Sequence, residues 1–285
     1  TVTGDVTDGA GETRSASRAV TVGYTALAAS LGTPAWLEAA KPIEIDVRTT
    51  TLDGLGQAAA GTLTIVRLRE PERITRAGDA ATEYVERVSG HYMRRSRTPV
   101  AVTPPPSDAG DPSSWPDGPE VSTRTVRTDT LGFARVPVRL GAGMYRARFQ
   151  TRDRFGKTVT ALVPLRVLDP GSERFPLRVR DLFVAREGSV EPGGEFLALW
   201  GTGYDSARVF VEVEHRGRLL QAYWTSPRAT QVAIRQRVDA TMRGGFTVRV
   251  TRVAENRAYL HEQPISVPWS DRVLTVRWEH FVSKL

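Results

Sequence analysis

Four histidines are the side chains of this chain best suited to acid–base or metal chemistry. They are widely separated, and no two of them lie four residues apart as ligands on a helix would: His91, His215, His261 and His280. The chain contains no cysteine, which excludes disulfides, cysteine nucleophiles and thiolate metal sites. The sequence therefore predicts no metal site, and we expect His215 to be a surface residue beside a hairpin turn.

Other groups that could do chemistry have simpler structural readings. Glu212 and Glu214 are spaced as a pair of acids on one strand face, but they alternate with valines and so indicate a solvated strand face. No serine lies in a Gly-x-Ser-x-Gly motif, and the pairs Gly193-Gly194 and Gly244-Gly245 are too short to bind phosphate. We predict no catalytic residue and no cofactor site, and we expect the chain not to be an enzyme.

The positive charge of the chain is spread along its predicted strands. The net charge is +7 and the isoelectric point is near 10.1. In residues 145–152 the arginines alternate with Tyr145, Ala147 and Phe149, which places them on the opposite, solvated face of a strand. This dispersed pattern argues against nucleic-acid binding, which would favour a clustered basic patch.

A repeated strand–turn–strand pattern is the main sign of the fold. Residues 1–22 contain an Asp-x-x-Gly turn at Asp8, and residues 145–167 contain the same turn at Asp153. Aspartate and glycine are typical of such turns, because the carboxylate binds nearby amides and glycine accepts a positive φ. After each turn, similar side chains recur at matching offsets: Thr13, Ala16, Val20 and Val22 in the first copy, and Thr158, Ala161, Leu165 and Val167 in the second. A looser third copy starts at Gly245 and turns around Asn256. Repeats at this spacing predict tandem β-sandwiches.

We therefore predict an all-β chain of tandem immunoglobulin-like or macroglobulin-like antiparallel β-sandwich domains. Residues 1–23 would be the closing hairpin of a preceding domain, and 268–285 the first strand of a following one. The two sandwiches would span 24–170 and 171–267, joined by short proline-containing linkers. We expect Trp200 and Trp224 to be core aromatics of the second sandwich, and Asp129, like Asp153, to be a turn residue.

A long insertion interrupts the first sandwich at about residues 70–120. Its first half, 80–97, has the apolar spacing of a short helix, and Arg94, Arg95 and Arg97 make this part the more susceptible to proteases. Residues 103–116 are rich in proline and predict an exposed, extended loop. The insertion is either a protease-sensitive segment or a surface loop, and the surface loop is favoured.

Longer strings in the second sandwich are more specific. They run from Val190 to Gly193, from Trp200 to Tyr204, from Val211 to Gly217, from Arg243 to Val248, from Glu255 to Leu260, from Val267 to Trp269 and from Trp278 to Phe281. Together with the turn at Asp153 and the strand start at residues 129–134, they resemble the bacterial alpha-2-macroglobulin family. The resemblance is to its N-terminal macroglobulin-like domains that lead towards the bait-region domain.

The resemblance implies a large periplasmic or extracellular protein that traps endoproteases when they cut a bait segment. Capture in that family depends on a thioester formed by a cysteine, which this chain lacks. The resemblance thus implies a non-catalytic scaffold whose partners are endoproteases, through the complete protein, and neighbouring domains. No apolar run approaches the roughly 18 residues of a membrane span, so we expect no direct membrane insertion.

Two other interpretations remain open. The modules could be adhesive or spacer domains of a large bacterial surface protein, with the insertion as a ligand contact. A more distant alternative is a carbohydrate-active enzyme with β-sandwich accessories, which the absence of a convincing acid pair disfavours.

Overall fold

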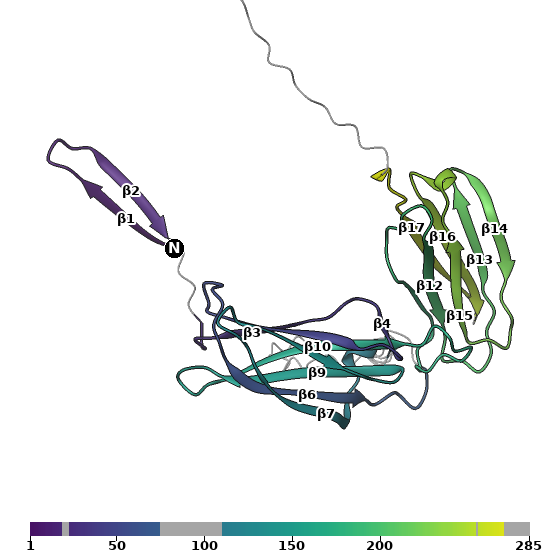
Figure 1. Ribbon diagram of the computed structural model, residues 1–285, viewed down its shortest axis with the longest axis horizontal. Helices are drawn as coiled ribbons and strands as arrows, with labels where there is room; N and C mark the ends of the chain where they lie inside the picture. Colours follow the sequence, from purple (N-terminus) through teal and green to yellow (C-terminus); the bar gives the residue numbers. More distant parts are fainter. Residues whose placement is uncertain (19–22, 75–109, 255, 271–285) are drawn as a thin grey trace, which may run out of the picture. The chain divides into compact units, whose positions relative to one another are not determined.

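The chain forms β-sandwiches and almost no helix, as a computed structural model of the protein shows (Figure 1). The structure describes residues 1–18, 23–74, 110–254 and 256–270. The chain divides into two compact units, Thr1–Asp169 and Pro170–Leu285. Within the described ranges, no helix has the length and apolar character needed to cross a membrane. The prediction of tandem antiparallel sandwiches is confirmed. The partial domains predicted at the two ends stay predictions, and the helix predicted at 80–97 lies outside the described residues.

The first hairpin forms as the sequence predicts. Strands β1 (Val2–Thr7) and β2 (Thr13–Arg18) pair antiparallel, and all their side chains are exposed. Because a two-stranded hairpin is marginally stable in water, its support by a neighbouring domain remains an expectation.

The first sandwich consists of two sheets. One is the sheet β3-β5-β8, with strands β3 (Ala28–Gly32), β5 (Ile43–Thr50) and β8 (Phe133–Val138). The other has the order β4-β10-β9-β6-β7, with strands β4 (Leu37–Glu38), β10 (Thr158–Leu168), β9 (Gly143–Arg152), β6 (Ala60–Leu68) and β7 (Asp117–Arg127). All pairings are antiparallel except the short parallel pairing of β4 with β10.

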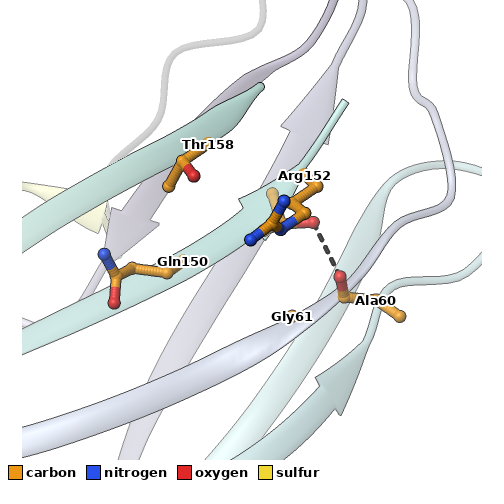
Figure 2. A pocket seen from close by; sticks show the side chains of 6 residues that line it. Ala60, Gly61, Gln150, Arg152 and Thr158 are labelled. Atoms are coloured by element: carbon orange, nitrogen blue, oxygen red, sulfur yellow. Dashed lines mark hydrogen bonds between the residues drawn. The ribbon is translucent and has the colours of Figure 1, made fainter. Parts of the chain in front are cut away.

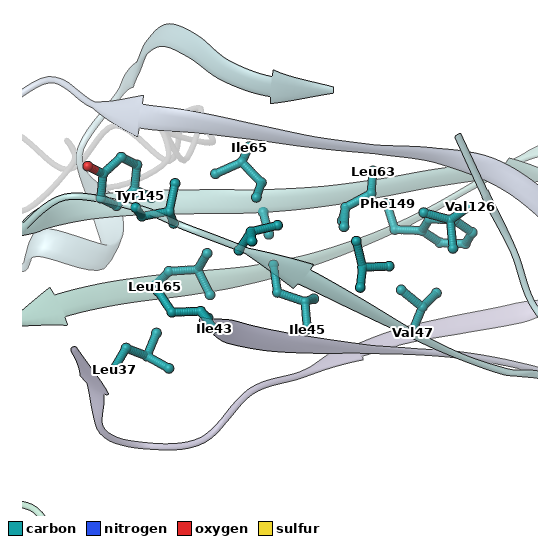
Figure 3. Close-up of a cluster of buried hydrophobic side chains, with 14 of the residues drawn as sticks. Leu37, Ile43, Ile45, Val47, Leu63, Ile65, Val126, Tyr145, Phe149 and Leu165 are labelled. Carbon is teal, nitrogen blue, oxygen red and sulfur yellow. The ribbon is translucent and has the colours of Figure 1, made fainter. Parts of the chain in front are cut away.

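Alternate residues of facing strands fill the core between these two sheets (Figure 3). Ile43, Ile45 and Val47 of β5 face Tyr145 and Phe149 of β9, and all five are buried. The alternation follows from the two-residue period of a strand, which sends every second side chain to the same face. Burial of each such side chain stabilises the fold by about 1.5–3 kcal/mol relative to leaving it in water.

The second sandwich also has two sheets. The three-stranded sheet has the order β11-β12-β15, with strands β11 (Leu182–Ala185), β12 (Glu195–Gly201) and β15 (Gln231–Arg237). The four-stranded sheet has the order β14-β13-β16-β17, with strands β14 (Arg218–Trp224), β13 (Phe210–His215), β16 (Phe246–Ala254) and β17 (Arg257–Ile265). A short 3₁₀ helix, η2 (Ala240–Met242), precedes β16.

The two tryptophans predicted for this core differ in their burial. Trp200 of β12 is completely buried, as predicted. Trp224 is 51% exposed, so its assignment to the core was wrong. The reason is the register of β14, which places Trp224 opposite Phe210. The neighbouring Val211 and Val213 point into the core, and Phe210 and Trp224 therefore lie on the outer face of the sheet.

Three turns of the first unit share one hydrogen-bond pattern. In each turn the aspartate amide donates to the carbonyl four residues later, and the glycine amide donates back to the aspartate carbonyl: Asp8 with Gly11, Asp129 with Gly132, and Asp153 with Gly156. Each aspartate Oδ1 also accepts two amides of its own turn at 2.9 Å. The glycines have φ values of 86°, 71° and 77°. The predicted role of Asp129 and Asp153 as turn residues is confirmed.

Asp153 gives the first unit a pH-dependent contribution to stability. Its Oδ2 accepts the Ala26 amide at 2.9 Å, 127 residues away, and this bond, followed by those from the amides of Lys157 and Phe155, lowers the pKa of Asp153. Because the folded-state pKa is lower than the unfolded one, the contribution is complete above the unfolded value of about 3.9. It is lost as the pH falls through the folded value.

We therefore expect acidification from about pH 6 to about pH 3 to lower the melting temperature of the first unit. Asp153→Asn should lower that temperature at pH 6 and flatten its pH dependence, because an amide nitrogen cannot accept the Ala26 amide. Calorimetric melts across this range would test it, with Asp5→Asn on the exposed β1 as the matched control. An unchanged slope for Asp153→Asn would contradict the assignment.

Candidate functional site

The acids that sequence spacing singled out belong to a polar sheet surface. Glu212 and Glu214 flank the buried Val213 on β13, as predicted. Glu214 accepts Arg249 Nη1 at 2.5 Å, and Arg249 Nε contacts Glu262 at 3.2 Å. These pairs raise the pKa of Arg249 and join the three strands β13, β16 and β17. They stabilise the sheet, and they hold Glu214 in an ion pair with Arg249.

The histidines are placed in different settings. His91 and His280 lie outside the described residues. His215 is half-buried rather than a plain surface residue, because its Nδ1 lies 2.6 Å from the carbonyl oxygen of Gly245. The turn after it, Arg216-Gly217, has two positive φ angles (50° and 76°), which are typical of a tight hairpin.

His261 has a carboxylate neighbour that the sequence analysis missed. Its Nε2 is hydrogen bonded to Oδ2 of Asp181, a distance of 80 residues along the chain. Asp181 Oδ1 also accepts the indole N–H of Trp200 at 2.8 Å, and the imidazole stacks on Phe183 with 5.5 Å between ring centroids. The Asp181 side chain is 6% exposed and the His261 side chain 31%. Among the described residues, this is the one histidine–carboxylate pair joined by a hydrogen bond.

The geometry of this pair favours a structural role. A catalytic dyad requires a nucleophile or a substrate proton within hydrogen-bond reach of the free imidazole nitrogen. In the part of the chain that the structure describes, the His261 imidazole forms no hydrogen bond other than that to Asp181. Asp181 instead receives a bond from β12 in one sheet and one from β17 in the other. It therefore links the two sheets of the second sandwich.

A second polar cluster stabilises the same region. Arg252 is buried, donates to the carbonyl oxygen of Arg180 at 2.9 Å, and lies against two aromatic rings. Its guanidinium is 4.9 Å from the ring centroid of Tyr204 and 5.5 Å from that of Tyr259. Such cation–π contacts contribute about 0.5–2 kcal/mol. Among the described residues, no group of three histidine and acidic side chains could hold a metal ion.

The end of the insertion is a well-defined polar site on the first sandwich. Residues Asp117, Arg146 and Arg148 meet there: Asp117 forms an ion pair with Arg146 and accepts Arg148 Nη2 at 2.5 Å. Arg146 Nη2 also donates to the carbonyl oxygens of Ser113 at 2.6 Å and Trp115 at 3.0 Å. The alternation of arginines along β9 is as predicted, but Arg146 is only 18% exposed, so its solvated placement was wrong. Residues 113–115, which lead from the insertion back into β7, cover the Arg146 side chain.

Trp115 anchors this returning chain. Residues 103–116 were predicted to form an exposed, extended loop, which was wrong for the conformation of 112–114 and for the exposure of Trp115. Residues Pro112–Ser114 form a short 3₁₀ helix capped by Asp111, and Trp115 is 1% exposed. Apolar burial of the indole outweighs the local polarity of the segment. Residues 75–109, with the three clustered arginines, lie outside the described part.

The two ends of the insertion meet at its base. Leu68, the last residue of β6, pairs with Asp117, the first residue of β7, and the Arg69 amide donates to the Pro116 carbonyl at 2.9 Å. The β6–β7 ladder therefore extends to the base of the insertion and holds its two ends together.

We accordingly expect replacement of residues 75–109 by a glycine–serine linker of about ten residues to leave the first unit folded. Its free energy of unfolding should rise by about 1 kcal/mol, because a shorter loop loses less entropy on closure. Urea unfolding measures this. Trp115→Ala in the shortened chain is the control and should cost about 3–5 kcal/mol. If the shortened chain with Trp115 intact were already unfolded, the sandwich would depend on residues 75–109.

A shallow hollow lies at the end of the larger sheet of the first unit (Figure 2). It is lined by Ala60, Gly61, Gln150, Thr151, Arg152 and Thr158. The Thr151 hydroxyl donates to the Ala60 carbonyl at 2.7 Å. Arg152 is the one ionisable side chain in the lining, so no acid and base converge there. The arrangement is that of an open sheet surface rather than a substrate site.

Comparisons with known proteins return structures only. The chain is similar to Escherichia coli alpha-2-macroglobulin in its native conformation, determined by cryo-electron microscopy (11% identity, 92% of this chain and 16% of that chain, TM-score 0.29). It is also similar to Salmonella alpha-2-macroglobulin reacted with methylamine (11% identity, 91% and 16%, TM-score 0.28). A third is the tetra-tandem repeat in the extending region of a large adhesion protein (14% identity, 93% and 55%, TM-score 0.26). The resemblance is weak, and the chain spans less than two thirds of each of these proteins. No protein-family model and no curated protein matches the chain.

Proposed function

We propose that the chain is a non-catalytic scaffold segment of a bacterial alpha-2-macroglobulin-like protease trap in the periplasm or outside the cell. Its macroglobulin-like sandwiches would form part of the shell that surrounds a captured endoprotease. The motif strings of the second sandwich and the tandem all-β fold support this proposal.

One observation carries the non-catalytic part of the proposal. Side chains that chemistry would require are occupied in holding the fold together: Asp129 and Asp153 bind turn amides, and Asp181 joins His261 to Trp200. A group that must accept or deliver a proton needs access to a substrate. Asp153, through the Ala26 amide, and Asp181 instead link segments that are distant in sequence, as a stiff module requires.

Scaffold modules in a trap must pass on a rearrangement without unfolding. The described sandwiches are suited to this, because each has a continuous buried core and long antiparallel ladders. We propose that endoproteases contact the complete protein and that this segment transmits the movement to neighbouring domains.

The proposal is tested by the hydrodynamic radius of the complete protein before and after limited cleavage by an endoprotease. We expect a change in radius, measured by sedimentation velocity, while this segment stays uncut between residues 110 and 254. An unchanged radius after complete bait cleavage would argue against a trap. Hydrolytic activity of the purified segment, lost in His261→Gln, would instead argue for an enzyme.

A second candidate is an adhesive or spacer module of a large surface protein. The firmly held base of the insertion favours it, because binding loops are usually carried on rigid scaffolds. A protein or glycan ligand whose binding disappears when residues 75–109 are replaced, with the fold retained, would support this alternative.

A further inference from the structure

Strand β14 is an exposed apolar edge of the second sandwich. It is the terminal strand of the sheet β14-β13-β16-β17, and all seven of its residues are exposed. Its large apolar side chains keep much of their surface in water: Leu219 52%, Leu220 39%, Tyr223 37% and Trp224 51%. An edge strand presents unpaired amide and carbonyl groups, and an apolar one is a template for a further strand.

The pairing of β14 shows which backbone groups point outward. Just beyond the strand, the Thr225 amide donates to the Val209 carbonyl at 3.0 Å, so these two residues form a hydrogen-bonded pair. Such pairs alternate along an antiparallel ladder. The pair Trp224 with Phe210 lies one step from it and the pair Ala222 with Glu212 lies three steps from it, so both are non-hydrogen-bonded. Trp224 and Ala222 therefore direct their N–H and C=O groups to the open edge.

Other long edge strands of the two sandwiches are protected against strand addition. Strands β7, β8 and β17 each contain a proline: Pro119, Pro137 and Pro264. Proline lacks the amide hydrogen that an added strand would bind, and it blunts an edge. Strand β15, the edge of the facing sheet, carries Arg235 and Arg237. β14 has neither a proline nor a charge within its apolar run.

Cationic side chains flank β14 at both ends, while Glu212 of the neighbouring β13 lies opposite Ala222. The Arg208 guanidinium lies 4.5 Å from the ring centroid of Trp224 at one end of the strand, and Arg218 begins the strand at the other. Within the described ranges neither forms an ion pair with a carboxylate. Gln221 Nε2 donates to Gln236 at 3.0 Å, which brings the β15 edge with Arg237 beside the same strand. The strand thus offers an apolar centre between cationic ends.

We propose that β14 binds an extended acidic segment of another protein by β-strand addition. The backbone groups of Ala222 and Trp224 would pair with the added strand, Trp224 and its apolar neighbours would cover its centre, and Arg208 and Arg218 would meet carboxylates at its ends. A second copy of this chain is disfavoured as the occupant, because each copy carries a net charge of +7. The inference does not depend on the proposed function.

The probe is a fluorescein-labelled peptide of about eight residues, the usual length of a strand, with alternating valine and threonine in the centre and glutamates at both ends. We expect saturable binding by fluorescence anisotropy, weakening as salt is added. A matched peptide with lysines in place of the glutamates should bind at least about tenfold more weakly.

Ala222→Pro tests the backbone contact directly. It removes an amide hydrogen that points to the open edge and spares the ladder to β13, so the sandwich should keep its melting temperature while the affinity falls at least about tenfold. Ala222→Thr keeps the amide and should bind like the unmodified chain. Trp224→Ala, which changes no backbone group, should also weaken binding. It replaces the proline variant as the test if that variant unfolds.

Three results would overturn the proposal. The first is equal binding of both peptides, and the second is the absence of saturable binding. The third is full affinity in both single variants, the folded Ala222→Pro and Trp224→Ala. Self-association of the unmodified chain in sedimentation equilibrium, abolished by Ala222→Pro, would assign the edge to a second copy and also overturn it.

Discussion

Trp200→Ala should be among the most destabilising single changes in the second unit, with a loss of about 3–5 kcal/mol. The indole is completely buried in the core, and its N–H binds the Asp181 carboxylate that also holds His261. The substitution removes the core volume and one of the two bonds through which Asp181 links the sheets. The loss corresponds to a decrease in melting temperature of about 10–20 °C for a unit of this size.

The comparison with Trp224→Ala makes this prediction specific. Trp224 is 51% exposed and lies on the outer face, so its removal should cost about 1 kcal/mol or less. Both variants would be followed by urea unfolding monitored by circular dichroism. Equal losses would mean that the register of β14 is wrong and that Trp224 belongs to the core.

Gly132→Ala should destabilise the first unit far more than Gly156→Ala. Both glycines occupy the same position of an Asp-x-x-Gly turn with nearly equal φ, 71° and 77°. A Cβ at Gly132 would lie 1.9 Å from the Thr49 carbonyl oxygen and 2.8 Å from the Gln57 amide nitrogen, whereas a Cβ at Gly156 meets nothing within 4 Å. Gly156→Ala therefore costs only the left-handed backbone, about 1–2 kcal/mol.

At Gly132 the turn must also separate from β5. The Thr49 amide donates to the Gly132 carbonyl at 2.8 Å, and the Thr49 carbonyl accepts the Gln57 amide at 3.0 Å. We expect the steric overlap to raise the total cost to about 3 kcal/mol or more. Urea unfolding of the two variants gives the difference. Similar losses would show that strain in the turn, not contact with Thr49, sets the cost.

Local chemistry explains what the sequence could predict. The turns at Asp129 and Asp153 need only residues within the turn itself, so residue type and spacing were sufficient. The strand face of Val211 and Val213 follows from the two-residue period in the same way. The fold class, built from such short-range signals, was therefore accessible from the residues alone.

Contacts between distant segments explain what the sequence could not predict. Asp181 and His261 are 80 residues apart, and only the packing of one sheet on the other brings them together. Trp115 lies among prolines and serines, and its burial depends on the chain returning across β9 to Arg146. Trp224 is exposed because the pairing of β14 with β13 places it opposite Phe210 on the outer face of the sheet, a register that the residues of β14 alone do not determine.

The most direct test of the scaffold proposal uses the complete protein mixed with several unrelated endoproteases. Residual protease activity would be measured on a small chromogenic peptide and on a large protein substrate. We predict that activity on the large substrate is lost while activity on the small peptide is retained, because a shell of sandwich domains excludes the larger molecule. Equal activity on both substrates would contradict a protease trap and favour the adhesive module.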